Sequence, residues 1–260
     1  MGQTWRNQTE RRYELDRERA EETLARLNDN VDRITYTPDS IVTLVTTTYL
    51  DSAEQHYFKF QQENDGKKSI KMRVREYFPL SNDGNFTILK DFPYCFLERK
   101  ERNGRIRLKE RIEVPKTMVT ALINREQDFS NEGSEVDVIR KEIQAHKLSP
   151  VVTSAYERRV WGNEELRITF DERIRFYTPP KSLYQMIPAM RPNVLGQPIG
   201  VGPKRIVEIK HSVDYTPPSW LSEMIEDLTE MVHYSKFING IEATNRKRRI
   251  SHLTGIIIPS

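Results

Sequence analysis

The chain has 260 residues, which is enough for one large domain or two small ones with a sizeable core. Charged residues make up 30% and hydrophobic residues 37%, so the chain is polar, yet it is too rich in Tyr, Phe and Ile to be disordered. The net charge of +3 excludes a uniformly basic coat for nucleic acid, and any anion-binding field must come from local clustering. Cys95 is the only cysteine, which excludes an internal disulfide and a multi-cysteine zinc site.

The beginning of the chain gives no targeting signal. Residues 1–22 lack an apolar h-region, and no apolar run in the chain approaches membrane-spanning length. We therefore expect a cytosolic (cytoplasmic) protein without a transmembrane segment, so that any coupling to a membrane would need a separate membrane-protein partner. The sequence does not set the oligomeric state.

The first half of the chain predicts a helix and then a series of strands. Ala20, Leu24 and Leu27 have helical spacing within residues 16–28, whereas residues 41–50 are β-branched and aromatic and predict a strand. A strand over residues 69–77 is bracketed by the turn signals Asn64-Asp65-Gly66 and Asn82-Asp83-Gly84. Asn103-Gly104 separates two alternating runs and predicts a hairpin.

The second half mixes helices with further strands. One helix is expected after Pro115 and another at Ser134, followed by strands over residues 151–161 and 165–177 that Gly162-Asn163 joins. Residues 178–204, rich in Pro and Gly, predict a long surface loop, and residues 205–211 predict a strand. Ser219 is expected to cap a helix with one apolar stripe, formed by Leu221, Met224, Ile225, Leu228 and Val232. This order predicts an α+β fold in a single domain over residues 1–260, with a core of about residues 12–240.

Five segments alternate charged and apolar residues with a period of two. They are Arg73-Val74-Arg75, residues 97–100, residues 105–111, residues 166–171 and residues 207–210. Since successive side chains of a strand point to opposite faces, each segment has one charged and one apolar face. The pattern alone fits two arrangements equally: an open sheet with its charges in water, or a barrel with its charges inside.

The type of charge favours the barrel. The charged faces gather many Arg and Lys with a few carboxylates, and like charges opposite one another destabilise a sheet unless a counter-ion compensates. Arg binds phosphate oxygens through two parallel hydrogen bonds, Lys supplies point charges, and carboxylates hold Mg²⁺ or Mn²⁺. A polyphosphate chain with a divalent metal needs this combination.

The order and spacing of these residues resemble a known family. The motifs are residues 46–52, Arg73-x-Arg75, Glu98-x-Lys100, Lys109-Glu110-Arg111, Tyr156-x-Arg158, residues 166–171, Glu208-x-Lys210 and Ser235-Lys236-Phe237. Together they are similar to the VTC domain, the polyphosphate-polymerase branch of the triphosphate tunnel metalloenzymes, over roughly residues 12 to 240.

The resemblance implies an eight-stranded antiparallel β-barrel that forms a charged tunnel, with helices packed outside, and ATP-dependent growth of inorganic polyphosphate. It also implies roles for particular residues. The groups expected to grip ATP, triphosphate or product are Arg73, Arg75, Lys100, Lys109, Arg158 and Arg167, with Lys210 as a further binding residue. Lys236 would lie near the transferring phosphoryl group or at the tunnel mouth. Glu208 would be the main ligand of Mn²⁺ or Mg²⁺, with Glu98 and Asp171 as weaker candidates.

The first strand departs from the family pattern. The family usually begins with a Glu-x-Lys strand whose lysine faces the phosphates, and the stretch that matches it is Tyr13-Glu14-Leu15-Asp16-Arg17. This alignment puts Asp16 at the lysine position, unless Arg17 substitutes through a shift in register. We therefore expect either a rearranged site or reduced activity.

Three functions remain open on the sequence. A polymerase leads, because Glu-x-Lys at Glu98 and Glu208 is richer in cations than the Glu-x-Glu motifs of hydrolytic relatives. A metal-dependent hydrolase of tripolyphosphate or nucleoside triphosphates is the second, and a non-catalytic polyphosphate-binding module, supported by Asp16, is the third. No recognition helix or basic stripe indicates binding to nucleic acid.

Overall fold

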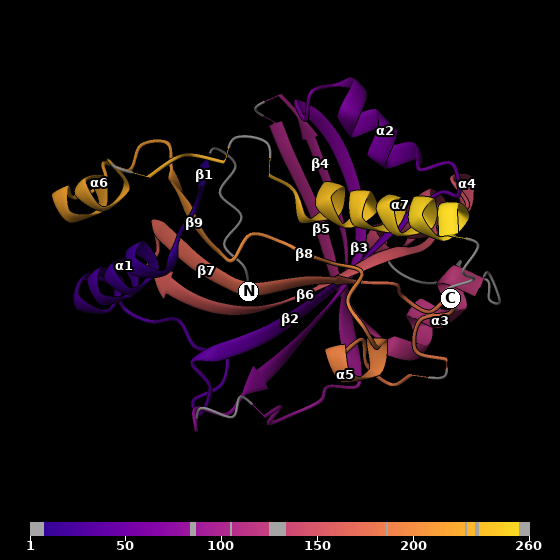
Figure 1. Ribbon diagram of the computed structural model, residues 1–260, viewed down its shortest axis with the longest axis horizontal. Coiled ribbons are helices and arrows are strands. Elements are labelled where there is room, and N and C mark those ends of the chain that lie inside the picture. Colours follow the sequence, from indigo (N-terminus) through magenta and orange to yellow (C-terminus); the bar gives the residue numbers. More distant parts are fainter. Residues whose placement is uncertain are drawn as a thin grey trace.

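The computed structural model describes residues 8–83, 87–104, 106–124, 134–185, 187–226, 228–231 and 234–254. Within them, nine strands alternate with seven helices (Figure 1). The strands are β1 (Gln8–Glu14), β2 (Val42–Asp51), β3 (Lys68–Leu80), β4 (Tyr94–Asn103), β5 (Ile106–Pro115), β6 (Ser149–Gly162), β7 (Leu166–Tyr177), β8 (Gly200–Val201) and β9 (Arg205–Ser212). The helices are α1 (Arg17–Asn30), α2 (His56–Glu63), α3 (Lys116–Asn124), α4 (Ser134–Ala145), α5 (Pro192–Leu195), α6 (Ser219–Glu226) and α7 (Lys236–Thr254).

Eight of the strands form one antiparallel sheet in the order β1-β9-β7-β6-β2-β3-β4-β5, and the short β8 pairs with β7 beside this path. The sheet is strongly curled into a half-barrel. Its edge strands β1 and β5 meet through their side chains, since Arg107 Nη1 of β5 lies 2.8 Å from Glu10 Oε2 of β1. Backbone pairing between β1 and β5 is absent from the described residues. The predicted α+β fold with eight antiparallel strands is confirmed.

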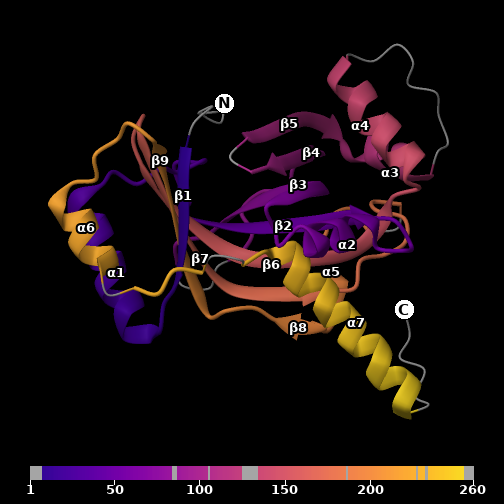
Figure 2. The same cartoon turned by 90° about the horizontal axis from the view of Figure 1, so that it is seen from above.

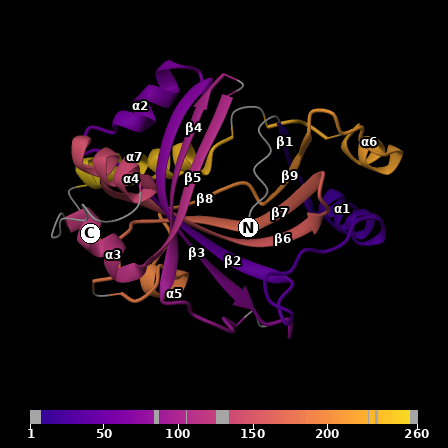
Figure 3. The same cartoon turned by 180° about the vertical axis from the view of Figure 1, so that it is seen from behind.

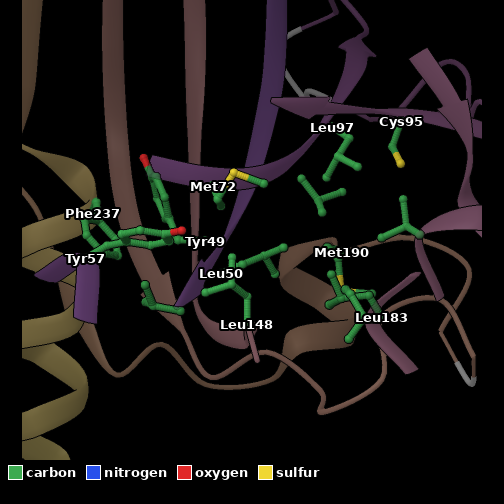
Figure 4. Packing of buried hydrophobic residues seen from close by; sticks show 14 of the residues in the cluster. Tyr49, Leu50, Tyr57, Met72, Cys95, Leu97, Leu148, Leu183, Met190 and Phe237 are labelled. Carbon is green, nitrogen blue, oxygen red and sulfur yellow. The ribbon is translucent and has the colours of Figure 1, made fainter. Parts of the chain in front are cut away.

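The apolar faces of the alternating strands point outward and are mostly covered by helices, except at the start of β5, where Ile106 and Leu108 are exposed. At one end of the molecule α1 and α6 lie side by side against β1, β7 and β9, around Trp161, Phe170 and Val207 (Figure 2). At the other end α2, α3 and α4 cover β3, β4 and β5, as the view from behind shows (Figure 3). Figure 4 shows this second core, where Leu50, Met72 and Leu97 of the sheet meet side chains from helices and loops. Of the two arrangements that fit the alternation, the structure has the one with its charges inside.

Most predicted boundaries agree with the structure to within a few residues, and both helix starts after Pro115 and at Ser134 are confirmed. The Gly162-Asn163 hairpin is confirmed as well. Gly162 has φ +151°, and a Cβ there would meet Leu166 O at 2.1 Å, so the turn requires glycine. The Asn103-Gly104 hairpin joins β4 to β5, although Arg105 of the alternating run, Gly84 of the second turn signal and Val232 of the apolar stripe lie outside the described residues.

The predicted surface loop 178–204 is only partly a loop. It contains α5 and β8, and Leu183 and Met190 are fully buried in the core of the convex face (Figure 4). The Met190 N–H donates to the buried carboxylate of Glu76 (2.9 Å). Buried apolar side chains amid Pro and Gly fasten this segment to the sheet. The helix predicted after Ser219 is also shorter than expected, because α6 ends at Glu226 before Leu228.

Candidate functional site

The concave face of the half-barrel carries nearly all the predicted site residues. Alternate positions of seven strands (β1, β3, β4, β5, β6, β7 and β9) point into it, and the register places Arg73 opposite Glu98 and Glu98 opposite Arg111. The cations that it gathers far outnumber the carboxylates. The cations are Arg12, Lys71, Arg73, Arg75, Lys100, Arg107, Lys109, Arg111, Arg158, Arg167, Lys210 and Lys236, and the carboxylates are Glu10, Glu98, Asp171 and Glu208.

Glu98 is the centre of one cluster, which we call the Glu98 centre. Its carboxylate is buried and lies 2.5 Å from Arg73 Nη2, with further cations at 3.5–4.0 Å from Arg75, Lys109 and Arg111. Burial alone would raise the pKa of Glu98, but these four cations hold it well below its usual range. One carboxylate therefore faces four positive charges, and the centre keeps an excess of positive charge that a bound anion would neutralise.

Asp171 joins β6, β7 and α7. Arg158 Nε and Nη2 donate to its two oxygens at 2.6 and 2.7 Å, and Lys236 Nζ donates to Oδ2 at 2.7 Å. Burial would raise the pKa of Asp171, but Arg158 and Lys236 lower it below its usual value. The Lys236 ammonium also lies 4.4 Å from the ring centroid of Tyr156. The start of α7 is thereby fixed against the concave face, where its lysine adds a further charge.

A third cluster lies where the two edges of the sheet meet, and we call it the seam: Glu10, Arg12, Arg107, Glu208 and Lys210. Lys210 Nζ lies 2.7 Å from Glu208 and 3.6 Å from Glu10, so one ammonium bridges two carboxylates. Arg12 Nε donates to Glu208 at 2.6 Å. Burial opposes the ionised form of Glu208, but Lys210 and Arg12 hold its pKa well below its usual range.

Two lysines on the concave face have no carboxylate partner among the described residues. Lys100 lies opposite Lys71 and Lys109 in the register, and burial together with the charges of Lys210 and Arg73 holds its pKa well below the usual range for lysine. Lys71 donates to Ser235 Oγ at 3.1 Å, and burial, Arg12 and Arg73 lower its pKa to about 7. Both ammonium groups would gain from a bound anion.

The first strand corrects the sequence alignment. β1 covers Gln8–Glu14, so the strand has the form Glu10-Arg11-Arg12, in which Arg12 and Glu10 face inward and pair with Glu208 and Lys210 in the register. Asp16, predicted at the lysine position, is instead the N-cap of α1 and accepts from the Arg19 N–H at 2.9 Å. Arg12 therefore supplies the cation that the alignment had missed, and the one observation that favoured a non-catalytic module is removed.

Arg167 is the predicted site residue that lies apart from the clusters. It is on the inward face of β7, but its guanidinium is at the rim and donates to the Tyr36 hydroxyl at 2.5 Å. The residues that the sequence missed are Glu10 and Arg12. Their signal was present, since Glu10-x-Arg12 repeats the Glu-x-cation pattern of the other strands, but no apolar alternation marks β1.

A curled antiparallel sheet with a cationic interior and Glu-x-cation strands defines the class of triphosphate tunnel folds. The profile of one family, the VTC domain, matches residues 7–245. The chain therefore belongs to the VTC domain family. No curated protein matches the sequence.

Solved structures with this fold are similar at low identity. The PH1819 protein from Pyrococcus horikoshii has a TM-score of 0.43 and 12% identity, over 90% of this chain and 98% of that one. HpAC1 from Hippeastrum, an adenylyl cyclase candidate described as having a dominant triphosphatase activity, has a TM-score of 0.44 and 12% identity, over 97% of both chains. At such scores these similarities carry no argument about function.

The seam fits the divalent metal that this family generally uses. Glu208 and Glu10 lie on neighbouring strands and both pair with Lys210 and Arg12, so their carboxylates are close together and a metal ion would replace these cations as their partner. Among the described residues no group of three or more His, Cys, Asp or Glu could hold a metal by itself. Mg²⁺ is commonly bound through one or two carboxylates, with substrate phosphates and waters completing its shell. In the part of the chain that the structure describes, no helix is long and apolar enough to span a membrane.

Proposed function

We propose that the protein is an ATP-dependent inorganic polyphosphate polymerase, which transfers the γ-phosphoryl group of ATP to the end of a growing chain on the concave face. The observation that carries this proposal is the excess of cations over carboxylates there. Each strand motif pairs one Glu with a cation two residues on, at Glu10, Glu98 and Glu208. Such a surface suits a long anion better than it suits the two metal ions of a hydrolytic site.

The transfer breaks the bond between the β-γ bridging oxygen and the γ-phosphorus, and it forms a bond from a terminal oxygen of the chain to that phosphorus, leaving ADP. Arg73, Arg75 and Arg158 would hold the donor and acceptor phosphates in line, which removes most of the entropic barrier. Lys236 would neutralise charge that develops on the phosphoryl oxygens.

Mn²⁺ or Mg²⁺ held by Glu208, with Glu10 beside it, would supply further neutralisation of phosphate charge. Glu98 and Asp171 have a different role in this proposal. Glu98 Oε2 accepts from Arg73, and the two oxygens of Asp171 accept from Arg158 and Lys236, so these carboxylates orient the cations that face the phosphates. The reaction needs no side-chain nucleophile.

The test is to incubate the full chain with ATP and Mn²⁺ and to resolve the products on a gel stained for polyphosphate, while ADP and free phosphate are assayed. Long polyphosphate chains are expected, with one ADP released for each phosphate unit added. Free phosphate without chains would identify the hydrolase, and bound polyphosphate without ADP would identify a binding module. Either result would overturn the polymerase.

A further inference from the structure

One cavity of the molecule is lined by aromatic rings. It has a volume of about 210 Å³ and lies at the end of β3 and β4, beside the segment that connects them. This is below the roughly 300–1,000 Å³ of sites that enclose a whole drug-sized ligand, so the cavity suits one ring system of a larger molecule. We call it the aromatic pocket, and the rings that define it are Tyr36, Tyr77, Phe92, Tyr94 and Phe96.

The rings form a continuous chain of contacts. Tyr77 and Tyr94 each meet Phe96 edge-on, with centroids 5.6 and 6.0 Å apart, and Phe92 and Tyr94 are 5.1 Å apart. Tyr36 completes the pocket 6.1 Å from Tyr77. The core rings of the convex face are fully buried, whereas Tyr36 is 53% exposed and Tyr94 and Phe96 are half-buried. The pocket is thus open to a ligand.

The aromatic pocket continues the cationic concave face. Tyr77 and Phe96 are the next inward-facing residues after Arg75 on β3 and Glu98 on β4. Arg111 lies on the boundary, because its guanidinium is 3.8 Å from the Phe96 ring centroid and its Nε is 3.5 Å from Glu98. A ligand with a planar ring joined to a chain of phosphates would place the ring among the aromatic side chains and the phosphates against Arg75 and Arg111.

We infer that the aromatic pocket binds the nucleobase of a nucleoside triphosphate. The inference rests on the proposed function and deepens it, because it makes the site selective for a nucleotide over inorganic triphosphate. Stacking on aromatic rings tolerates any base, so the pocket favours nucleotides as a class. With the base there, the phosphates point inward towards Arg73, and the chain extends away from this end.

The test compares a triphosphate that carries a nucleoside with one that does not. The full chain is titrated with the β,γ-imido analogue of ATP and with inorganic tripolyphosphate, each with Mg²⁺, by calorimetry. The analogue is expected to bind more tightly. Phe96→Leu should lower the affinity for the analogue about tenfold, as expected for the loss of one stacking contact. The affinity for tripolyphosphate should change less than about twofold. Tyr94→Leu should act in the same direction.

Tyr215→Leu is the matched control, because Tyr215 is a half-buried ring paired with His211 on the convex side. It should change neither affinity. Equal binding of the two ligands, or equal weakening of both by Phe96→Leu and Tyr94→Leu, would overturn the inference.

The product gel separates this inference from the proposed function. Polyphosphate chains made without any preference for the analogue over tripolyphosphate would keep the polymerase and refute the base site. Aromatic-dependent binding of the analogue without chain growth would keep the base site and refute the polymerase.

Discussion

The Glu98 centre and the seam start from the same motif and differ in their neighbours. Glu98-x-Lys100 lies on β4, between β3 and the edge strand β5, where one carboxylate meets four cations. Glu208-x-Lys210 lies on β9, next to the other edge strand β1, where Glu10 brings a second carboxylate to the same lysine. Under the proposed function, cross-strand neighbours therefore decide the role of a motif: Glu98 would orient cations, and Glu208 would share a metal with phosphate.

The largest effect should come from Glu208→Gln. It removes a charged ligand without changing the shape of the side chain, and a loss of a few kcal/mol of charge stabilisation corresponds to roughly a 100-fold fall in the rate of chain growth. The measurement is ADP release against Mn²⁺ concentration, with circular dichroism to show that the fold is intact. Undiminished turnover would contradict the metal assignment and erase the difference between the two centres.

The double variant Arg73→Ala with Arg75→Ala removes two cations from the Glu98 centre. Hydrogen bonds to charged groups contribute about 1.5–3 kcal/mol each, so affinity for tripolyphosphate should fall by more than about 100-fold and depend less on salt. Arg99→Ala is the control, because Arg99 lies on the convex face of the neighbouring strand β4, where it pairs with Glu101 of β4 and Glu110 of β5. If the control weakens binding as much, the concave face is not the binding surface.

Glu98→Gln should act on stability before it acts on chemistry. Removal of one partner from a buried ion pair costs about 3–5 kcal/mol, since four cations are left close together. A bound polyanion would relieve their repulsion, so tripolyphosphate should raise the melting temperature more in this variant than in the parent. The dependence on Mn²⁺ should stay as in the parent protein. A loss of that dependence would make Glu98 a metal ligand.

Arg12 and Asp16 test the corrected first strand. Arg12→Met should lower the affinity for tripolyphosphate by about tenfold, because a charged contact at the seam is lost. Asp16→Ala removes an N-cap and should cost about 1 kcal/mol of unfolding free energy without a change in affinity. Calorimetry and denaturant melts on the same two proteins separate these effects. If Asp16→Ala lowered the affinity for tripolyphosphate and Arg12→Met did not, the alignment that placed Asp16 at the phosphate-facing position would be right.

The sequence predicted the fold and most of the site because period-two alternation is strong on the inner strands. It missed elements that this signal does not mark. The buried Asp51 accepts hydrogen bonds from the N–H groups of Tyr57 and Phe58 at the start of α2. Because Asp51 lies six residues before Tyr57, a local capping pattern does not show this contact. α7 is polar on most sides and contains Gly240, where a Cβ would meet Val152 at 2.9 Å. Its helix depends on packing against β6, which no local pattern shows.

The alignment of the first strand failed for a related reason. Residues 8–12 of β1 are all polar, so the strand shows no alternation of charged and apolar residues. The buried Tyr13 and Leu15 do alternate with polar residues, and the family motif was therefore aligned too close to the helix α1. Only the pairing of Arg12 with Glu208 across the sheet fixes the register. The role of Glu98 was likewise beyond the sequence, because it follows from the convergence of three strands.

The smallest effect concerns pH at Lys71. Its pKa of about 7 lies below the usual value for lysine, so the ammonium loses its proton as pH rises through 7, and a bound polyanion would raise the pKa again. Binding then takes up protons, and affinity for tripolyphosphate should fall by about fivefold between pH 6.5 and 8. Because the ligand also titrates, the quantity to measure is the ratio of affinities of the parent and Lys71→Gln at each pH. This ratio should fall towards one as pH rises, and a ratio that is independent of pH would show that Lys71 stays charged and that the concave face does not depress its pKa.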